Sequence, residues 1–142
     1  MQVGRATRED LEAISTLHAH FWGDASDVEA MAETLETLGN DHDHFLLAAR
    51  LDGTCVGTAT GVVCHGLYGG FDSYLVIEDV VVDPAFRRQG VGTALLDELE
   101  HLAREAGCKQ VILLTESCRG DAVALYKAAG YQGRWTGFKK KL

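Results

Sequence analysis

Proline, long apolar runs and paired cysteines are all scarce in this chain, and these shortages exclude several classes of protein. Pro84 is the one proline among the 142 residues. No uninterrupted apolar run is longer than that of residues 45–49, far below the roughly 18 residues that mark a membrane span. The N-terminal residues also lack the apolar core of a signal peptide. We therefore expect a cytoplasmic protein that has no membrane partner.

The cysteine pattern is equally sparse. None of the four cysteines stands in a C-x-x-C spacing, and their neighbours in the sequence are apolar or typical of strands. This pattern is typical of reduced, packed thiols rather than of disulfides or a metal site. The residues are Cys55, Cys64, Cys108 and Cys118.

Positively charged residues are outnumbered in this chain. It has thirteen Lys and Arg against twenty-one Asp and Glu, which gives a net charge of −8. Such a chain repels polyanions and attracts cations at long range, so nucleic acid is not an expected partner. Hydrophobic residues make up 46% of the chain, which excludes a disordered protein. The length fits one domain, residues 1–142.

Capping patterns predict two helices near the N-terminus. Thr7 can cap the first helix, with Asp10 at the third helical position. Ser26 can cap the second, because Glu29 follows it by three residues. Apolar residues recur at helical spacing in both segments, so each helix should cover a sheet with one face.

The rest of the chain alternates strand and helix patterns. Asp52-Gly53, between two apolar segments, predicts a β-hairpin, and a long strand from residue 74 should end at Pro84. A helix over 91–106, a buried strand at 111–114, a helix ending before Gly130 and an extended end follow. The prediction is an α/β fold with a mixed central sheet of about six or seven strands and about four helices.

The segment 83–93 carries the strongest functional signal. It joins the long strand to a helix, whose first N–H groups and dipole favour an anion. Gly90 and Gly92 would let a pyrophosphate approach the backbone, and Arg87 and Arg88 add positive charge. A dinucleotide fingerprint would need glycine at Leu95, and the spacing does not fit a P-loop, so another phosphate-bearing ligand is expected.

The residues Arg87-Arg88-Gln89-Gly90-Val91-Gly92 resemble the acetyl-CoA signature Arg/Gln-x-x-Gly-x-Gly/Ala of the GNAT superfamily of N-acetyltransferases. The segment Leu-Tyr-Lys-Ala-Ala-Gly-Tyr at 125–131 is similar to the family's Leu-Tyr-x-x-x-Gly-Phe/Tyr. The resemblance covers roughly residues 3–138, and the two motifs are its specific parts.

The resemblance implies a GNAT-like fold in which strands four and five splay apart and acetyl-CoA, the cosubstrate, lies in the gap. It places pantetheine against the backbones of Val80 and Val82. It places the pyrophosphate at Arg87, Arg88, Gln89, Gly90, Val91, Gly92 and Thr93. Arg119 departs from the family, which often has asparagine there.

The chemistry of amide formation from a thioester requires an acid for the departing thiolate and a base for the amine. The resemblance puts the hydroxyl of Tyr126 beside the sulfur, and the pKa of an unperturbed tyrosine, about 10, lies near that of a thiol. Strand alternation puts Glu78 on one face with Val80 and Val82, which makes it the candidate base. A chain of water molecules is the alternative base. A backbone N–H near Val80 could meet the oxyanion.

A cluster of two aspartates and two histidines at 41–44 also invites a metal interpretation. It stands in a polar connection before a strand, which favours a solvated loop, and no metal is expected.

The sequence thus predicts an N-acetyltransferase that transfers an acetyl group from acetyl-CoA to a primary amine in a ternary complex. The net charge favours a cationic small molecule such as a polyamine, an amino acid or an aminoglycoside. Two alternatives stay open: an acetyltransferase of protein N-termini or lysines, and a CoA-binding sensor without turnover. Related domains often pair through their sheet edges, so a homodimer is also expected.

Overall fold

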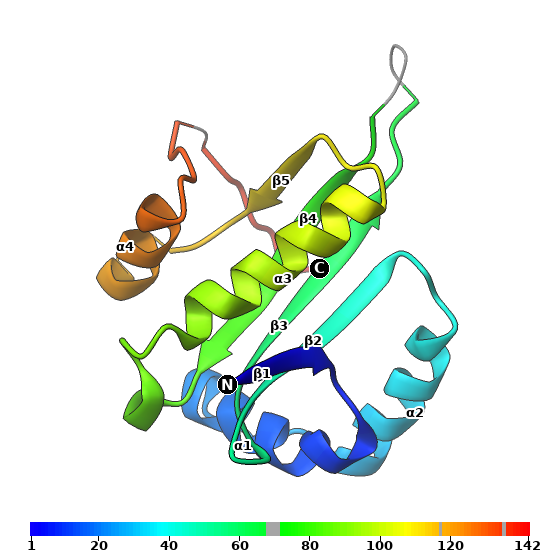
Figure 1. Ribbon diagram of the computed structural model, residues 1–142, viewed down its shortest axis with the longest axis vertical. Helices are drawn as coiled ribbons and strands as arrows, with labels where there is room; N and C mark the ends of the chain where they lie inside the picture. Colours follow the sequence, from blue (N-terminus) through cyan, green and yellow to red (C-terminus); the bar gives the residue numbers. More distant parts are fainter. Residues whose placement is uncertain (68–71, 117, 135) are drawn as a thin grey trace.

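A five-stranded sheet forms the centre of the protein in a computed structural model that describes residues 1–67, 72–116, 118–134 and 136–142. Its strands follow one another in sequence order, antiparallel from β1 to β4, whereas β5 runs parallel to β4 (Figure 1). They are β1 (Gln2–Arg5), β2 (His44–Leu51), β3 (Thr54–Cys64), β4 (Tyr74–Val82) and β5 (Gln110–Leu113).

Four helices accompany the sheet in the described part of the chain, in agreement with the predicted number: α1 (Leu11–Trp22), α2 (Val28–Gly39), α3 (Val91–Glu105) and α4 (Gly120–Ala128). Leu95, Leu96 and Leu99 of α3 are buried in one apolar cluster with residues of β2, β3 and β4. Ile14 and Leu17 of α1 belong to a second cluster. The two helices therefore cover opposite faces of the sheet, with α3 on the near face in Figure 1.

The turn chemistry of the sequence is confirmed at the hairpin between β2 and β3. Asp52 and Gly53 have φ values of +49° and +82°, the left-handed conformations that a tight two-residue hairpin turn requires. The long strand before Pro84 is also confirmed, since β4 ends at Val82.

The predicted strand number is wrong, because the described residues form a sheet of five strands rather than six or seven. The difference lies in the C-terminal segment, where the described residues 131–134 and 136–142 contain no strand. Gly133 and Gly137 weaken strand formation in this segment, and three consecutive lysines oppose burial.

The second helix also begins one residue later than its pattern predicts. Asp27, not Ser26, is the N-cap, and its carboxylate accepts from the N–H groups of Glu29 and Ala30. The carbonyl oxygen of Ser26 instead accepts a hydrogen bond of 2.8 Å from the buried hydroxyl of Ser15 in α1.

Within the described residues, no helix combines the length and the apolar character needed to cross a membrane.

A buried ion pair ties the N-terminal segment to the sheet. Asp10 is 4% exposed and accepts hydrogen bonds from Nε of Arg50 in β2 at 2.8 Å and from its terminal nitrogen. The predicted cap residue, Thr7, donates its N–H to the same carboxylate at 2.7 Å. Burial alone would raise the pKa of Asp10, but the hydrogen bonds from Arg50 and Thr7 outweigh burial and lower it.

We predict that Asp10→Asn lowers the free energy of unfolding by about 3 kcal/mol, the scale for removing one partner of a buried ion pair. A lowered folded-state pKa stabilises the fold above the usual value of 3.8, and this contribution is lost as the pH falls through the folded-state pKa. Urea unfolding from pH 7 to pH 2 should show that slope in the wild type and in the exposed control Glu9→Gln. An equal slope in Asp10→Asn would contradict the assignment.

Candidate active site

The site begins where β4 and β5 separate. Four residue pairs join the strands, from Tyr74 with Gln110 to Ile77 with Leu113. β5 ends at Leu113, whereas β4 continues to Val82. One edge of β4 is therefore open over residues 78–82, as the predicted splay of these strands requires.

A β-bulge lies in this open half of β4. Thr58 pairs with Val81 and Thr60 pairs with Glu78, so one residue of β3 opposes two residues of β4. Asp79 adopts a φ of +53°, a left-handed conformation that is uncommon for a residue other than glycine.

The bulge overturns the alternation on which the placement of Glu78 depended. Val80 and Val82 pack against the apolar cluster that contains α3, whereas Val81 belongs to the cluster that contains α1. Thr58 and Thr60 are two residues apart in β3, so their side chains share one face of the sheet. Paired residues also share a face, so Glu78, the partner of Thr60, lies on the α1 face with Val81, the partner of Thr58. Glu78 therefore faces away from Val80 and Val82, and its side chain is exposed.

The connection from β4 to α3 forms a turn with its own caps. Asp83 accepts from the N–H of Ala85 at 2.8 Å and starts the short 3₁₀ helix Pro84–Phe86. Gly90, with a φ of +83°, is the N-cap of α3. The N–H of Ala94 donates to the carbonyl of Gly90, which leaves the three preceding amides at the open, positive end of the helix.

The structure explains the glycine at position 92 differently from the sequence, which suggested close approach of a pyrophosphate. A Cβ atom at Gly92 would lie 2.9 Å from Cδ2 of Leu125 in α4. Glycine at this position therefore lets α4 pack against the first turn of α3. Gly90, in contrast, faces open space, and a Cβ atom there would meet nothing within 4 Å.

An open cleft of about 710 Å³ runs between the open half of β4, the start of α3 and α4. This volume falls in the range of small-molecule and cofactor sites. Eight of the predicted cofactor residues line it together with Tyr126: Val80, Val82, Arg87, Arg88, Gly90, Val91, Gly92 and Thr93.

Two of the predicted site residues do not line this cleft. Gln89 turns its amide back to the carbonyl oxygen of Ala85, at 3.2 Å. Glu78 lies on the opposite face of the sheet, as described above. The sequence analysis had not assigned the other lining residues, which are Phe21, Val81, Phe86, Cys118, Arg119, Gly120, Asp121, Ala122, Ala124 and Leu125.

A helical pattern could have found part of that set. Ala122, Leu125 and Tyr126 share one face of α4 by their spacing, so the face that carries Tyr126 also predicts the other two. Phe21 is harder to find, because only the packing of α1 on the sheet brings it to the cleft.

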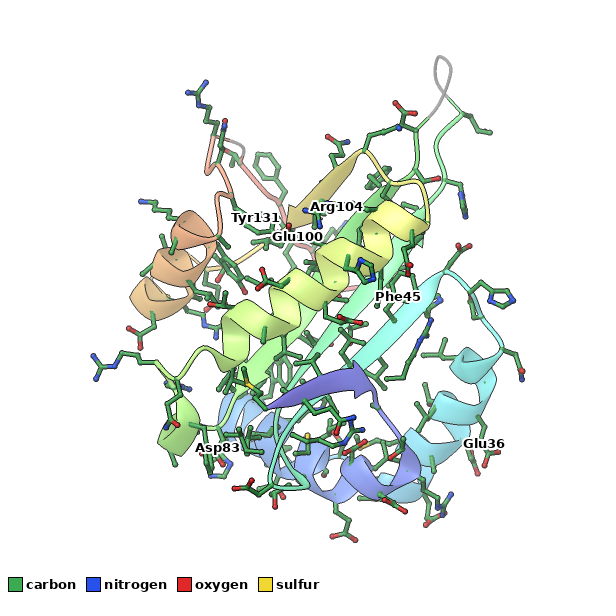
Figure 2. The ribbon with its side chains drawn as sticks, in the orientation of Figure 1. Glu36, Phe45, Asp83, Glu100, Arg104 and Tyr131 are labelled. Carbon is green, nitrogen blue, oxygen red and sulfur yellow. The ribbon has the colours of Figure 1, made fainter. Side chains whose placement is uncertain are left out.

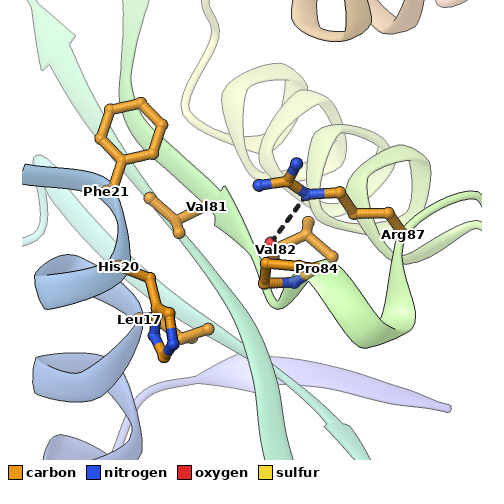
Figure 3. Close-up of a pocket in the computed structure, with 7 residues that line it drawn as sticks. All are labelled: Leu17, His20, Phe21, Val81, Val82, Pro84 and Arg87. Atoms are coloured by element: carbon orange, nitrogen blue, oxygen red, sulfur yellow. Dashed lines mark hydrogen bonds between the residues drawn. The ribbon is translucent and has the colours of Figure 1, made fainter.

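A small pocket adjoins the cleft between α1 and the end of β4 (Figure 3). His20 and Phe21 of α1 line it opposite Pro84 and Arg87. Figure 3 shows Arg87 turned back toward β4, where its Nε donates to the carbonyl oxygen of Val82 at 3.4 Å. This bond holds one of the two predicted anion-binding arginines near the end of β4.

Tyr126 has the burial expected of a proton donor that stays neutral until it reacts. Its residue is 9% exposed, and its ring packs edge-to-face on Tyr131 with 6.1 Å between centroids. Burial raises the pKa of Tyr126 above its usual value, although the charge of Arg119 acts in the opposite direction. The hydroxyl is therefore protonated at neutral pH.

Tyr131 has a separate environment on the α3 side (Figure 2). Burial, followed by the negative charge of Glu100, raises the pKa of Tyr131. The carboxylate of Glu100 forms an ion pair with the guanidinium of Arg104, with 2.8 Å between nitrogen and oxygen. Since Tyr131 does not line the cleft, it offers a matched comparison for Tyr126.

Arg119 crosses from the start of α4 to α1. Its guanidinium carbon lies 4.0 Å from the centroid of the Phe21 ring, within the range of a cation–π contact. Both residues line the cleft.

The histidines and aspartates near the start of β2 form pairs. His44 contacts Asp41 at 2.8 Å, and His65 contacts Asp43 at 2.9 Å. In the described part of the chain, no three His, Cys, Asp or Glu side chains gather in a metal-binding group.

The comparisons with known proteins agree with this geometry. The profile of the acetyltransferase (GNAT) family matches residues 11–131. The chain belongs to this family. It is accordingly an acetyl-CoA-dependent N-acetyltransferase.

Individual relatives extend over nearly the whole chain. An aminoglycoside N(6')-acetyltransferase type 1 of Stenotrophomonas maltophilia is 30% identical, over 92% of this chain and 85% of that protein. The N-alpha-acetyltransferase RimI of Mycobacterium tuberculosis is 34% identical, over 92% and 77%. The solved structure of a putative acetyltransferase from Agrobacterium tumefaciens aligns over all of both chains with a TM-score of 0.89 and 26% identity.

We predict that acetyl-CoA raises the Tm of the wild type and that Gly90→Val abolishes this shift, because a side chain at Gly90 would enter the open end of α3. A ligand at 100 times its Kd stabilises a fold by about 2.7 kcal/mol. Valine at a positive φ also strains the backbone, so Gly107→Val is the control, with a φ of +76° and open space at the far end of α3. A full shift in Gly90→Val would contradict the phosphate site.

Proposed function

We propose that residues 1–142 form a single domain that transfers the acetyl group of acetyl-CoA to the primary amine of a cationic small molecule. One observation carries the proposal: a buried, protonated tyrosine and the open positive end of a helix line the same cleft. A phosphate-bearing thioester with its reactive end near Tyr126 fits that arrangement.

The cleft is suited to hold the cosubstrate at both ends. We propose that the amides of 91–93 and the side chain of Arg88 bind the pyrophosphate, since a helix N-terminus and a guanidinium both favour anions. The open edge of β4 offers backbone groups at Val80 and Val82 to the pantetheine amides, as a neighbouring strand would. Two arginines beside this end of α3 stand out in a chain of net charge −8.

We assign Tyr126 as the general acid. The amine nitrogen forms a bond to the thioester carbon, the carbon–sulfur bond breaks, and the sulfur takes the proton of Tyr126. The proton released by the acetylated nitrogen restores the hydroxyl. Burial suits Tyr126 to this step, because it keeps the hydroxyl protonated until a strong base, the thiolate, develops next to it.

We retain Glu78 as the proposed base, with a changed position. It lies on the α1 face, opposite the backbone that we assign to pantetheine. A base on that face would take one proton from the ammonium form of the acceptor, from the side away from the cosubstrate, and so supply the neutral amine for attack. Its exposure also allows one or more water molecules to carry the proton, which keeps the water-chain alternative open.

The net charge and the relatives support the proposed acceptor class. The net charge of −8 favours a cationic amine, and the aminoglycoside enzyme of Stenotrophomonas maltophilia is named for such a substrate. RimI is named as an N-alpha-acetyltransferase, which supports protein N-termini as the second candidate. Membership of an acetyltransferase family favours both over the sensor without turnover.

We predict that release of free CoA, followed with a thiol reagent across a panel of amines, is fastest for polycationic small molecules. For the best acceptor, kcat/KM should fall as salt rises toward physiological ionic strength at fixed pH, because salt screens long-range attraction. Faster turnover of peptide N-termini than of every small amine would favour the second candidate instead.

We predict that Tyr126→Phe lowers kcat by about 10²-fold, the usual scale for loss of one general acid, and leaves the KM for acetyl-CoA nearly unchanged. The measurement is single-turnover acetyl transfer at saturating acetyl-CoA. Tyr131→Phe, which removes a hydroxyl from the other member of the ring pair, should keep the wild-type rate. Equal rates in wild type and Tyr126→Phe would overturn the assignment of the acid.

A further inference from the structure

Arg119 lies at the point where α1, α4 and the cleft meet. It is the N-cap residue of α4, so its backbone is fixed by the helix that carries Tyr126. Its guanidinium stacks on Phe21, near the C-terminal end of α1. The contact links two helices that are almost a hundred residues apart in the chain and lie on either side of the open half of β4.

The stacking fixes a positive charge in space. A guanidinium on a flexible side chain at a cleft mouth would sample many rotamers, and most would place it in water. An aromatic face restricts those rotamers and displaces water from one side of the planar group. Arg119 is therefore held inside the cleft that contains Tyr126, rather than extended into solvent.

A fixed charge at this place has a chemical consequence. When the departing thiolate takes the proton of Tyr126, the phenolic oxygen becomes anionic at a residue that is only 9% exposed. A preorganised positive group stabilises such developing charge without having to reorient. The other charged or titratable residues that line the cleft with Tyr126 are Arg87, Arg88, Cys118 and Asp121, and the ring of Tyr131 packs against that of Tyr126.

We propose that Arg119 is a positioning residue for acetyl transfer: held on Phe21, its guanidinium stabilises the anionic oxygen that Tyr126 acquires as it protonates the departing thiolate. The proposal depends on the proposed function for the role of Tyr126. It assigns to the Arg119–Phe21 pair an effect on the rate of the chemical step rather than on the binding of acetyl-CoA. Burial raises the pKa of Tyr126, and the positive charge of Arg119 opposes that rise, which is the direction that the proposal requires.

The kinetic test uses four variants and one control variant. Arg119→Gln should lower kcat roughly five- to tenfold and change the KM for acetyl-CoA less than about threefold. Arg119→Lys, which keeps the charge, should recover part of the rate. Phe21→Leu should lower kcat less than Arg119→Gln does, and the double variant should be no slower than Arg119→Gln alone, because one contact is lost in both. Arg8→Gln, which removes a charge from an exposed pair with Glu29, is the control.

A second readout separates this proposal from the proposed function. The phenol carbon of Tyr126, labelled with ¹³C and assigned by its absence in Tyr126→Phe, can be titrated by NMR. Its midpoint should move to higher pH in Arg119→Gln and return toward the wild-type value in Arg119→Lys. This measurement needs no turnover. It therefore tests the effect of Arg119 on the Tyr126 hydroxyl even where Tyr126→Phe shows that the tyrosine is not the acid.

Four results would overturn the proposal. One is an unchanged titration of Tyr126 in Arg119→Gln. Another is a loss confined to the KM for acetyl-CoA, which would make Arg119 a binding residue. The third is additivity of Arg119→Gln and Phe21→Leu, which would mean that the stacking does not hold the charge. A lower Tm in Phe21→Leu with an unchanged kcat would likewise reduce the contact to a structural role.

Discussion

The shortness of the pairing between β4 and β5 is the constraint on which the rest of the site depends. A parallel strand paired along all nine residues of β4 would fill the open edge and bury Val80 and Val82 beneath it. Pairing stops after four residues, and the chain leaves β5 toward α4. α4 then packs on the first turn of α3 through Leu125 and Gly92, so a second helix, not a strand, closes the far side of the gap.

The bulge at Asp79 determines which side chains of β4 lie on each face of the sheet. Before the bulge, Leu75 and Ile77 pack against the α3 cluster; after it, Val80 and Val82 do, and Val81 packs toward α1. A left-handed conformation at a residue other than glycine costs free energy and persists where the surroundings impose it. Here it turns Glu78 to the acceptor side that we propose, while the neighbouring backbone faces the cleft.

Local chemistry explains which features the sequence could predict. The Asp52-Gly53 turn, the end of β4 before Pro84 and the N-terminus of α3 at Gly90 each depend on a few adjacent residues, and each is as expected. The bulge, the helix contact at Gly92 and the position of Phe21 depend on residues far apart in the chain. Periodicity assumes an unbroken strand, so it could not place Glu78 on the correct face.

The predicted number of strands was wrong for a related reason. The C-terminal segment has an extended character in its sequence, but a strand requires a partner that can pair with it, and β5 is only four residues long. Exposed Phe138 and Leu114 show that apolar residues alone did not bring the segment into the sheet. Local propensity therefore set an upper limit on the number of strands, and the pairing available at the edge decided how many formed.

Charge distribution connects the fold to its chemistry. An acidic protein would repel a cosubstrate that carries several phosphates, unless positive groups were concentrated where it binds. Three arginines, Arg87, Arg88 and Arg119, line one cleft beside the positive end of α3. Two of them flank the helix terminus that suits phosphates, whereas the third lies apart, stacked on Phe21. In our proposal the pyrophosphate binds at Arg88 and the helix terminus, so Arg119 is left as a positive charge in the cleft when the thiolate departs.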